Sequence, residues 1–501
     1  MPEIAPTPAG GVMAAAGADR ATPALDPDRV AATGRPEAAP AAPDLPRFVT
    51  GSTMRHVVVM TGTGAVGLMA VFAVDLLSLL YVSWLGDPKL TAVVGLSSVV
   101  IFLAVSINLG VMIAVGALVS RALGAGDREG ARRIAGSACT HAAILGVLTS
   151  ALLLLGLHPL LGLIGANPDT LPLAERYLWI VLPSNALMAL GMAYSSVLRG
   201  VGDASRAMAV TLSGGVVTAI LDPVMIFGLK LGLDGAAITV VLSRLVFVLV
   251  GFHGAVRVHR LVARPTPRGA TDDLGRVAAI AAPAILTNIA PSIAGAFFTG
   301  IMARFGETAL AANAIIDRLV PVVFGGLFAL SGAIGPILAQ NWGARRFDRM
   351  RRALRDGVVF SGIYVAVAWA VLVLARQVIV QVFGVTGPAA DLVTFFCLVG
   401  GAIWFLNGLL FVANASFNNL GFPLLSTAFN WGRATIGTIP FAALGAHLAG
   451  PQGALVGTGV GSLVFGVASI VGAFRSITVL ERRAKESGPG AMPPAGAGRA
   501  R

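Results

Sequence analysis

Apolar stretches of roughly 20 to 28 residues recur from about residue 54 to residue 478, separated by short polar connections. Each stretch is long enough to cross a hydrocarbon layer of about 30 Å as an α-helix. The pattern therefore predicts about twelve transmembrane helices. We expect them at residues 54–84, 91–121, 134–163, 171–198, 205–229, 235–257, 277–303, 308–340, 355–383, 389–417, 423–446 and 452–478.

An internal repeat relates the two halves of the chain at a shift of about 219 residues. Gly124 recurs as Gly343, and Gly202 recurs as Gly421. A nearly constant offset argues for duplication, because chance matches would scatter. Each half holds an even number of helices, so both copies enter the membrane from the same side as parallel repeats. The predicted fold is an all-α polytopic membrane protein built from two six-helix repeats.

Composition and repeat together divide the chain into five predicted parts. The ends are rich in Ala, Pro and Gly and contain too little apolar surface to offset the entropy of ordering. The predicted parts are a disordered cytoplasmic tail (1–50), an N-terminal six-helix bundle (51–258), a cytoplasmic linker (259–276), a C-terminal six-helix bundle (277–480) and a second disordered cytoplasmic tail (481–501).

Charge is scarce and unevenly placed. Only 12% of residues are charged, against about 25% in soluble proteins. The net charge of +12 comes from arginines gathered in alternate connections, such as Arg128 to Arg133 and Arg345 to Arg355. This positive-inside pattern predicts a multi-pass protein of the cell inner membrane with both termini cytoplasmic. The expected partners are the lipid bilayer and a small-molecule substrate, with no nucleic acid, and we expect a monomer.

Two carboxylates lie inside apolar stretches. Asp75 falls in the first predicted helix and Asp222 in the fifth. An ionised carboxylate at such a depth costs at least about 2.5 kcal/mol, so each should face a cavity or a partner. The structural alternatives are that Asp75 pairs with a neighbouring helix or caps a break, and that Asp222 belongs to a turn enforced by Pro223.

Several short motifs occur in an order that resembles the multidrug and toxic compound extrusion (MATE) family, across about residues 54 to 480. They are Val74-Asp75 with Trp84-Leu85-Gly86, Gly124-Ala125-Gly126-Asp127, Leu198-Arg199-Gly200-Val201-Gly202-Asp203, Leu221-Asp222-Pro223 and Gly235-Ala236-Ala237. The resemblance implies an antiporter that exports organic, often cationic and amphipathic, compounds in exchange for H+ or Na+. It also implies two bundles forming a V around a central cavity.

The resemblance implies an ion-coupling site in the N-terminal half, where Asp75 and Asp222 match the branch with acids in helices one and five. Supporting groups are Asn185, Thr218 and Thr239, with Thr218 standing where the family commonly has Asn. No metal is expected beyond a possible Na+ at Asp75 and Asp222, and no cofactor beyond the coupling ion. Hard cations prefer such oxygen ligands.

Candidates for lining a substrate cavity are Ser184, Met188, Tyr194, Asp317, Arg318 and Asn407. The alternative for each is ordinary packing or pairing between helices. No enzyme is expected, since the chain has no HExxH motif, nucleophile elbow or phosphate loop. The rival function is a flippase for lipid-linked saccharides of the same superfamily, which would line its cavity with cationic side chains.

Overall fold

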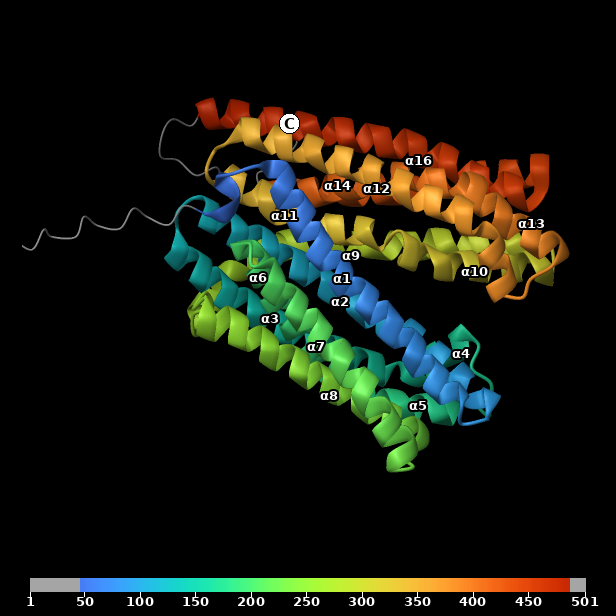
Figure 1. The fold of residues 1–501 in the computed structure, drawn as a ribbon. Helices are drawn as coiled ribbons and strands as arrows, with labels where there is room; N and C mark the ends of the chain where they lie inside the picture. The colour runs from blue at the N-terminus through green and yellow to red at the C-terminus, as the bar shows by residue number, and fades with distance from the viewer. Residues whose placement is uncertain (1–45, 487–501) are drawn as a thin grey trace, which may run out of the picture. The chain divides into compact units, whose positions relative to one another are not determined.

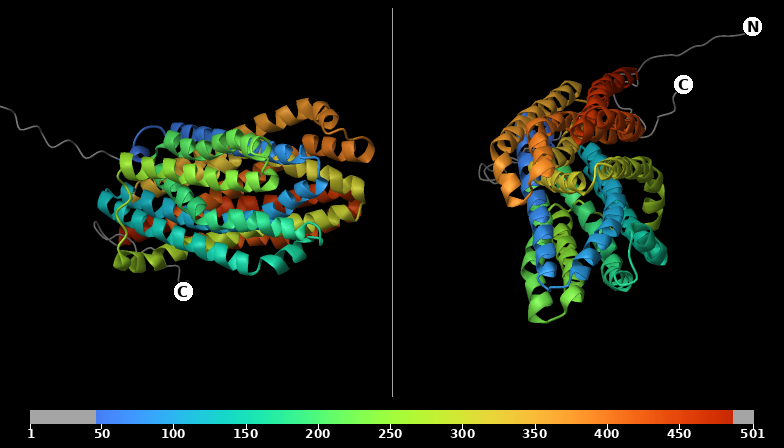
Figure 2. Two further views of the ribbon diagram at one scale, coloured as in Figure 1. Left: turned by 90° about the horizontal axis from the view of Figure 1, so that it is seen from below. Right: turned by 90° about the vertical axis from the view of Figure 1, so that its right-hand side faces the viewer.

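The computed structural model describes residues 46–486, and every regular element in this range is helical (Figure 1). Seen from below, the helices lie lengthwise beside one another (Figure 2, left), whereas in Figure 1 the blue-to-green helices slope away from the yellow-to-red ones. The α-helices are α1 (Thr53–Ser83), α2 (Pro88–Gly124), α3 (Arg128–Leu155), α4 (Leu157–Ile164), α5 (Leu171–Val181), α6 (Asn185–Val201), α7 (Ala204–Pro223), α8 (Gly232–Phe252), α9 (Pro267–Ala303), α10 (Glu307–Val323), α11 (Gly325–Gly343), α12 (Phe347–Val382), α13 (Gly387–Phe395), α14 (Gly401–Leu420), α15 (Pro423–Gly432) and α16 (Ile439–Glu486).

The prediction of twelve spans is confirmed when one bent helix pair is counted as a single span and one very long helical stretch is counted as two. Ten helical stretches are long and apolar enough to cross a membrane, and the α10–α11 pair, bent by 44°, makes an eleventh. One of the ten, Pro423–Glu486, has 64 residues. It is broken by non-helical Ala449 and Gly450. A helix of that length would be about 96 Å long, three times the hydrocarbon thickness, so it holds two spans.

The duplication is visible in the helix boundaries. α6 ends at Val201 and α14 at Leu420, 219 residues later. Both helices are followed by a left-handed glycine, Gly202 with φ 92° and Gly421 with φ 89°. Glycine adopts this conformation without the steric penalty of a Cβ, which is why it commonly ends helices. The repeat therefore preserves the backbone geometry of the turns.

Some predicted boundaries were wrong by several residues. The seventh span, expected from residue 277, begins at Pro267, because the Thr266 side chain caps the helix by accepting from the Gly269 N–H at 3.1 Å. The ordered chain also starts before residue 51, since Phe48 is only 1% exposed. α16 continues past residue 480, where Glu481 pairs with Lys485. The remaining predicted tails, 1–45 and 487–501, lie outside the described residues.

The basic connections meet at one end of the helices. Arg128 after α2 donates to the His259 carbonyl after α8 at 2.9 Å, and the Ala263 N–H donates to the Arg132 carbonyl at 3.0 Å. The described chain also starts and finishes here (Figure 1). We call this the arginine-rich end, meaning the connections after α2, α8 and α11 together with the last turn of α16.

Asp203 organises one connection at this end. Its carboxylate caps α7 by accepting from the Arg206 N–H at 3.1 Å, and it also accepts from the Arg206 guanidinium and from His259 Nε2 at 2.8 Å. Burial alone would raise the pKa of Asp203, but the hydrogen bonds from His259 and Arg206 outweigh it and hold the pKa below its usual value. The ionised form therefore stabilises this turn.

We predict that Asp203→Asn lowers the free energy of unfolding at pH 7 by about 1 kcal/mol, because Asn keeps the cap but loses the charge-assisted hydrogen bonds. A depressed folded-state pKa contributes stability above the ordinary carboxyl pKa, and that contribution is lost as pH falls through the depressed value. The difference between variant and parent in thermal unfolding should thus be complete near neutrality and shrink below about pH 4.

A matched control for this measurement is Asp169→Asn, which removes an exposed ion pair with Lys89. Exposed pairs contribute little, so this variant should unfold like the parent. An Asp203→Asn difference that persisted unchanged down to pH 3 would contradict the assignment of the effect to the carboxylate charge.

Candidate functional site

Three helices converge on Asp222. α1 lies along α7, with Gly67 against Thr211 and Gly215 against Val74, where an added Cβ would lie 3.5 Å and 3.4 Å from its neighbour. Small residues let helix backbones approach closely in a membrane. α8 packs on the other side of α7. The carboxylate of Asp222 therefore lies between helices.

Asp222 is buried, at 1% exposure, in the last turn of α7. Pro223 follows it, and the chain continues as a π-helical turn over Val224–Gly228. Such turns widen the helix and are frequent at functional sites. The carboxylate accepts from the Ser78 hydroxyl of α1. Thr239 of α8 lies close to the carboxylate, but its hydroxyl donates to the Gly235 carbonyl of its own helix at 3.0 Å. The structure thus adds Ser78 as the hydrogen-bond donor to Asp222.

Asp75 lies one helical turn before Ser78 on α1. It is exposed, and it makes no hydrogen bond or ion pair with any described residue. Residues three positions apart on a helix are neighbours, so Asp75 and the Asp222–Ser78 pair share one side of α1. The expected carboxylate pair is therefore one buried acid and one exposed acid in the same region.

Two predicted supporting groups are not brought to the carboxylates. Asn185 is buried where the short turn Leu182–Ser184 meets α6, and it is held by Asn108 at 2.8 Å and by the Gly146 carbonyl at 3.2 Å. Thr218 lies one turn before Asp222, but its hydroxyl donates to the Gly214 carbonyl of its own helix at 3.1 Å. Both residues contact backbone or amide groups rather than Asp75 or Asp222.

Three cavity candidates in the N-terminal half lie within its core. Ser184 donates to the Val181 carbonyl and accepts from Arg244 at 2.9 Å. Met188 packs against the core of α2, α3 and α6, and Tyr194 is 7% exposed in the same core. These side chains consolidate helix packing in the described conformation.

The candidates in the C-terminal half are more open. Asp317 and Arg318 are both exposed on α10; Asp317 accepts from Asn313 at 3.0 Å, whereas Arg318 has no partner among the described residues. Asn407 is half-buried on α14 and has no hydrogen bond to a described residue. Arg318 and Asn407 therefore keep polar groups free.

Ser78 and Arg244 were not predicted as site residues. Ser78 follows Asp75 by three positions within an apolar stretch, a spacing that could have identified it. Arg244 is buried on α8 and donates to the Val181 carbonyl at 3.0 Å, where α5 breaks. That role depends on a contact between segments 63 residues apart, for which the sequence holds no local signal.

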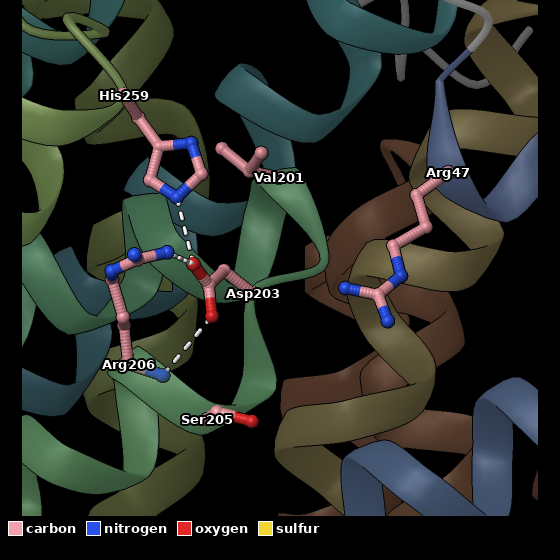
Figure 3. A pocket seen from close by; sticks show the side chains of 6 residues that line it. All are labelled: Arg47, Val201, Asp203, Ser205, Arg206 and His259. Atoms are coloured by element: carbon pink, nitrogen blue, oxygen red, sulfur yellow. Dashed lines mark hydrogen bonds and ion pairs between the residues drawn. The ribbon is translucent and has the colours of Figure 1, made fainter.

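A separate cavity of about 590 Å³ opens at the arginine-rich end (Figure 3). Its walls are Arg47, Val201, Asp203, Ser205, Arg206 and His259. In the close-up, His259 and Arg206 both point to Asp203 and Arg47 approaches from the facing segment. No described residue of this cavity belongs to the Asp222 region.

Side chains that could hold a transition metal do not gather in the described part of the chain, which has no group of three or more His, Cys, Asp or Glu at ligand spacing. Around Asp222, the available ligands are the carboxylate and the hydroxyls of Ser78 and Thr239. This all-oxygen set suits a proton or a hard cation rather than a soft metal.

Comparison with known proteins finds the MatE family model at residues 65–224 and again at residues 283–444. The two matches start 218 residues apart, which agrees with the internal repeat. Among curated relatives, the FAD transporter of Shewanella oneidensis is 29% identical over 415 residues, covering 80% of this chain and 90% of the relative. The multidrug export protein MepA of Staphylococcus aureus is 25% identical over 345 residues, covering 67% and 75%.

Solved structures agree on the fold. The Vibrio cholerae MATE transporter VcmN in the bent form superposes with a TM-score of 0.81 at 23% identity, covering 85% of this chain and 98% of that one. An outward-facing multidrug resistance MATE family transporter gives 0.81 at 21% identity, covering 88% and 99%. The duplicated twelve-helix fold and the two family matches, which span more than half of the sequence, show that this chain belongs to the MatE family of membrane transporters.

Proposed function

We propose that this protein is a secondary active antiporter that exports organic compounds across the inner membrane in exchange for H+ or Na+ by alternating access. The observation that carries the proposal is Asp222, a carboxylate buried between three apolar helices with one hydroxyl donor, Ser78, and no cationic partner among the described residues. An unpaired acid at this depth is costly and is retained where it serves ion transfer.

Ion binding at Asp222 would act on α1. An ionised carboxylate only accepts hydrogen bonds, whereas a protonated one also donates. Protonation of Asp222, or its ligation of Na+, would therefore change the hydrogen bond between Ser78 and the carboxyl group. That change would alter the contact between α1 and α7. Asp75, exposed one turn away, is placed to exchange the ion with water.

α1 also contacts the C-terminal half. Thr53 donates to Asp356 of α12, and a Cβ added at Gly64 would lie 3.4 Å from the Ala329 Cβ of α11. The same helix thus connects the ion site to the interface between the halves. In alternating access, this connection would allow ion binding to bias one conformation over the other.

For orientation, we propose that the arginine-rich end faces the cytoplasm, in keeping with the positive-inside rule. Both chain termini would then be cytoplasmic. We further propose that the protein acts as a monomer with no cofactor beyond the coupling ion, and that its partners are the bilayer and a small-molecule substrate rather than nucleic acid.

We predict that Asp222→Asn and Asp75→Asn each lower ion-driven efflux at least tenfold in reconstituted vesicles, because neither amide can bind a proton or provide a charged ligand. Efflux of a cationic dye should be measured under a pH gradient and then under a Na+ gradient, which also identifies the ion. Asp169→Asn is the control, as its carboxylate is exposed in the connection before α5. Full gradient-driven efflux by Asp222→Asn would exclude Asp222 as the coupling residue.

A second candidate substrate class is anionic. The relative from Shewanella oneidensis is named an FAD transporter, and FAD carries a pyrophosphate. Two arginines in the C-terminal half have free donors: Arg318 has no partner among the described residues, and Nε of Arg433 is buried without a hydrogen bond. Arginine binds phosphate groups with paired donors. The same groups would serve the rival function, a flippase for lipid-linked saccharides.

We predict that, if the substrate is a dinucleotide, Arg318→Gln lowers FAD efflux at least tenfold and leaves the efflux of a cationic dye unchanged. The readout is FAD fluorescence outside loaded vesicles. Arg304→Gln, in the exposed connection after α9, provides a charge-matched control. Transport of lipid-linked oligosaccharide without FAD or dye transport would favour the flippase instead.

A further inference from the structure

Two pairs of repeat-equivalent residues make crossed contacts between the halves at the arginine-rich end. Arg121 of α2 donates from Nη2 to the Asn419 carbonyl of α14 at 3.0 Å. Gln340 of α11 donates from Nε2 to the Gly200 carbonyl of α6 at 2.6 Å. Arg121 and Gln340 are 219 residues apart, and so are Gly200 and Asn419. Each half therefore gives the other the same contact.

Two glycines, themselves repeat equivalents, allow this approach. A Cβ added to Gly124 would overlap the backbone of Gln340, and a Cβ added to Gly343 would overlap the backbone of Arg121. Helices α2 and α11 of the two halves thus meet backbone to backbone at these glycines. Surfaces of this kind can separate without repacking a core.

The chemistry of the crossed contacts allows the two halves to separate at this end and to close again. Gly200 and Asn419 lie in the last turns of α6 and α14, where carbonyls lack a partner within their own helix. Side-chain donors satisfy these carbonyls across the interface. When the halves separate at the membrane surface, water can replace those donors, so opening leaves no buried polar group without a hydrogen bond.

The two contacts differ in strength. Arg121 carries a positive charge to the negative end of α14, and its guanidinium stacks on Trp342 at 3.5 Å from the ring centre. Gln340 is neutral, but its side chain also accepts from the Phe48 N–H at 2.9 Å.

We use the name crossed latch for this set of contacts. It consists of Arg121, Gln340, Gly124, Gly343 and the carbonyls of Asn419 and Gly200.

The segment before α1 reinforces this closure. Arg47 donates to the Gly202 carbonyl of the N-terminal half at 2.7 Å. Arg349 of the C-terminal half donates to the Phe48 and Thr50 carbonyls, each at 2.9 Å. Residues 47–50 thus bridge both halves beside the crossed latch.

We propose that the crossed latch is the gate that holds the arginine-rich end shut, and that breaking both crossed contacts is the step that opens the protein to this side. Contacts between the halves extend inward from the latch through Gly64 and Ala329 to Met69 and Gly325. Asp75, further along α1, is exposed. The gate rests on the proposed alternating access, and it adds the residues that control it.

The test uses Ala329→Cys as a reporter, because Ala329 is 6% exposed and lies behind the latch against α1. The native cysteines, Cys139 and Cys397, are replaced by Ser. A membrane-impermeant maleimide is added from the arginine-rich side. Gly124→Ala and Gly343→Ala should each increase the labelling rate at least fivefold, because the added methyl group prevents closure.

Gly95→Ala is the matched control, since it lies in the same helix as Gly124 with no neighbour within 4 Å, and its labelling rate should equal that of the parent. Arg121→Gln should also increase labelling, whereas Arg128→Gln, which removes a carbonyl contact within one half, should not. Unchanged labelling in Gly124→Ala and Arg121→Gln would overturn the gate.

A cross-link provides the opposite test in a folded protein. Thr53→Cys with Asp356→Cys, joined by a short thiol cross-linker, should reduce the labelling of Ala329→Cys at least fivefold, because these side chains already meet across the halves. Labelling as fast as in the parent would overturn the proposal. Labelling requires neither substrate nor ion gradient, so the result stands even if the proposed export function fails.

Discussion

In the hydrocarbon layer no water is present to satisfy a polar group, and this one constraint explains most of the structure. It requires continuous helices, and it requires a partner wherever a helix breaks. α5 ends before Pro183, and the carbonyls of Val181 and Leu182 at this break accept from Arg244 at 3.0 Å and from Ser150 at 2.6 Å. The carboxylate of Asp222, near the break at Pro223, accepts from Ser78. At both prolines, a break in the helix therefore occurs together with a polar contact from a neighbouring helix.

The two halves share the geometry of their helices, but they differ in the side chains to which a function is proposed. The halves share helix ends and left-handed glycines such as Gly202 and Gly421. They differ where function is proposed: the positions one repeat after Asp75 and Asp222 carry no acid. α2 is one helix, whereas its counterpart bends by 44° between α10 and α11. Similar backbones with different side chains fit the proposal that one half binds the ion and the other half responds.

The features predicted from sequence are those with strong local signals. Twelve spans follow from long apolar stretches, and Asp222 stands out because acids are rare within them. Asn185 was predicted to support the acids, but the structure gives it hydrogen bonds to Asn108 and to the Gly146 carbonyl, because its partners depend on how α6 packs against α2 and α3. Arg121, the last residue of the second predicted span, was given no role, since its contact with Asn419 joins positions 298 residues apart. Long-range packing of this kind has no sequence period to reveal it.

The ion site and the latch lie far apart, yet one element reaches both. α1 is a single helix of 31 residues, with Thr53 on the C-terminal half near the latch and Ser78 on Asp222. The 25 positions between Thr53 and Ser78 correspond to about 37 Å of helix. A small tilt of so long a helix at Asp222 produces a displacement of ångströms at its other end. Under the proposed mechanism, a displacement of that size would open the latch, because the latch depends on backbone contact at Gly124 and Gly343. Ion coupling would then require no chain of side-chain rearrangements, only a continuous helix held at both ends.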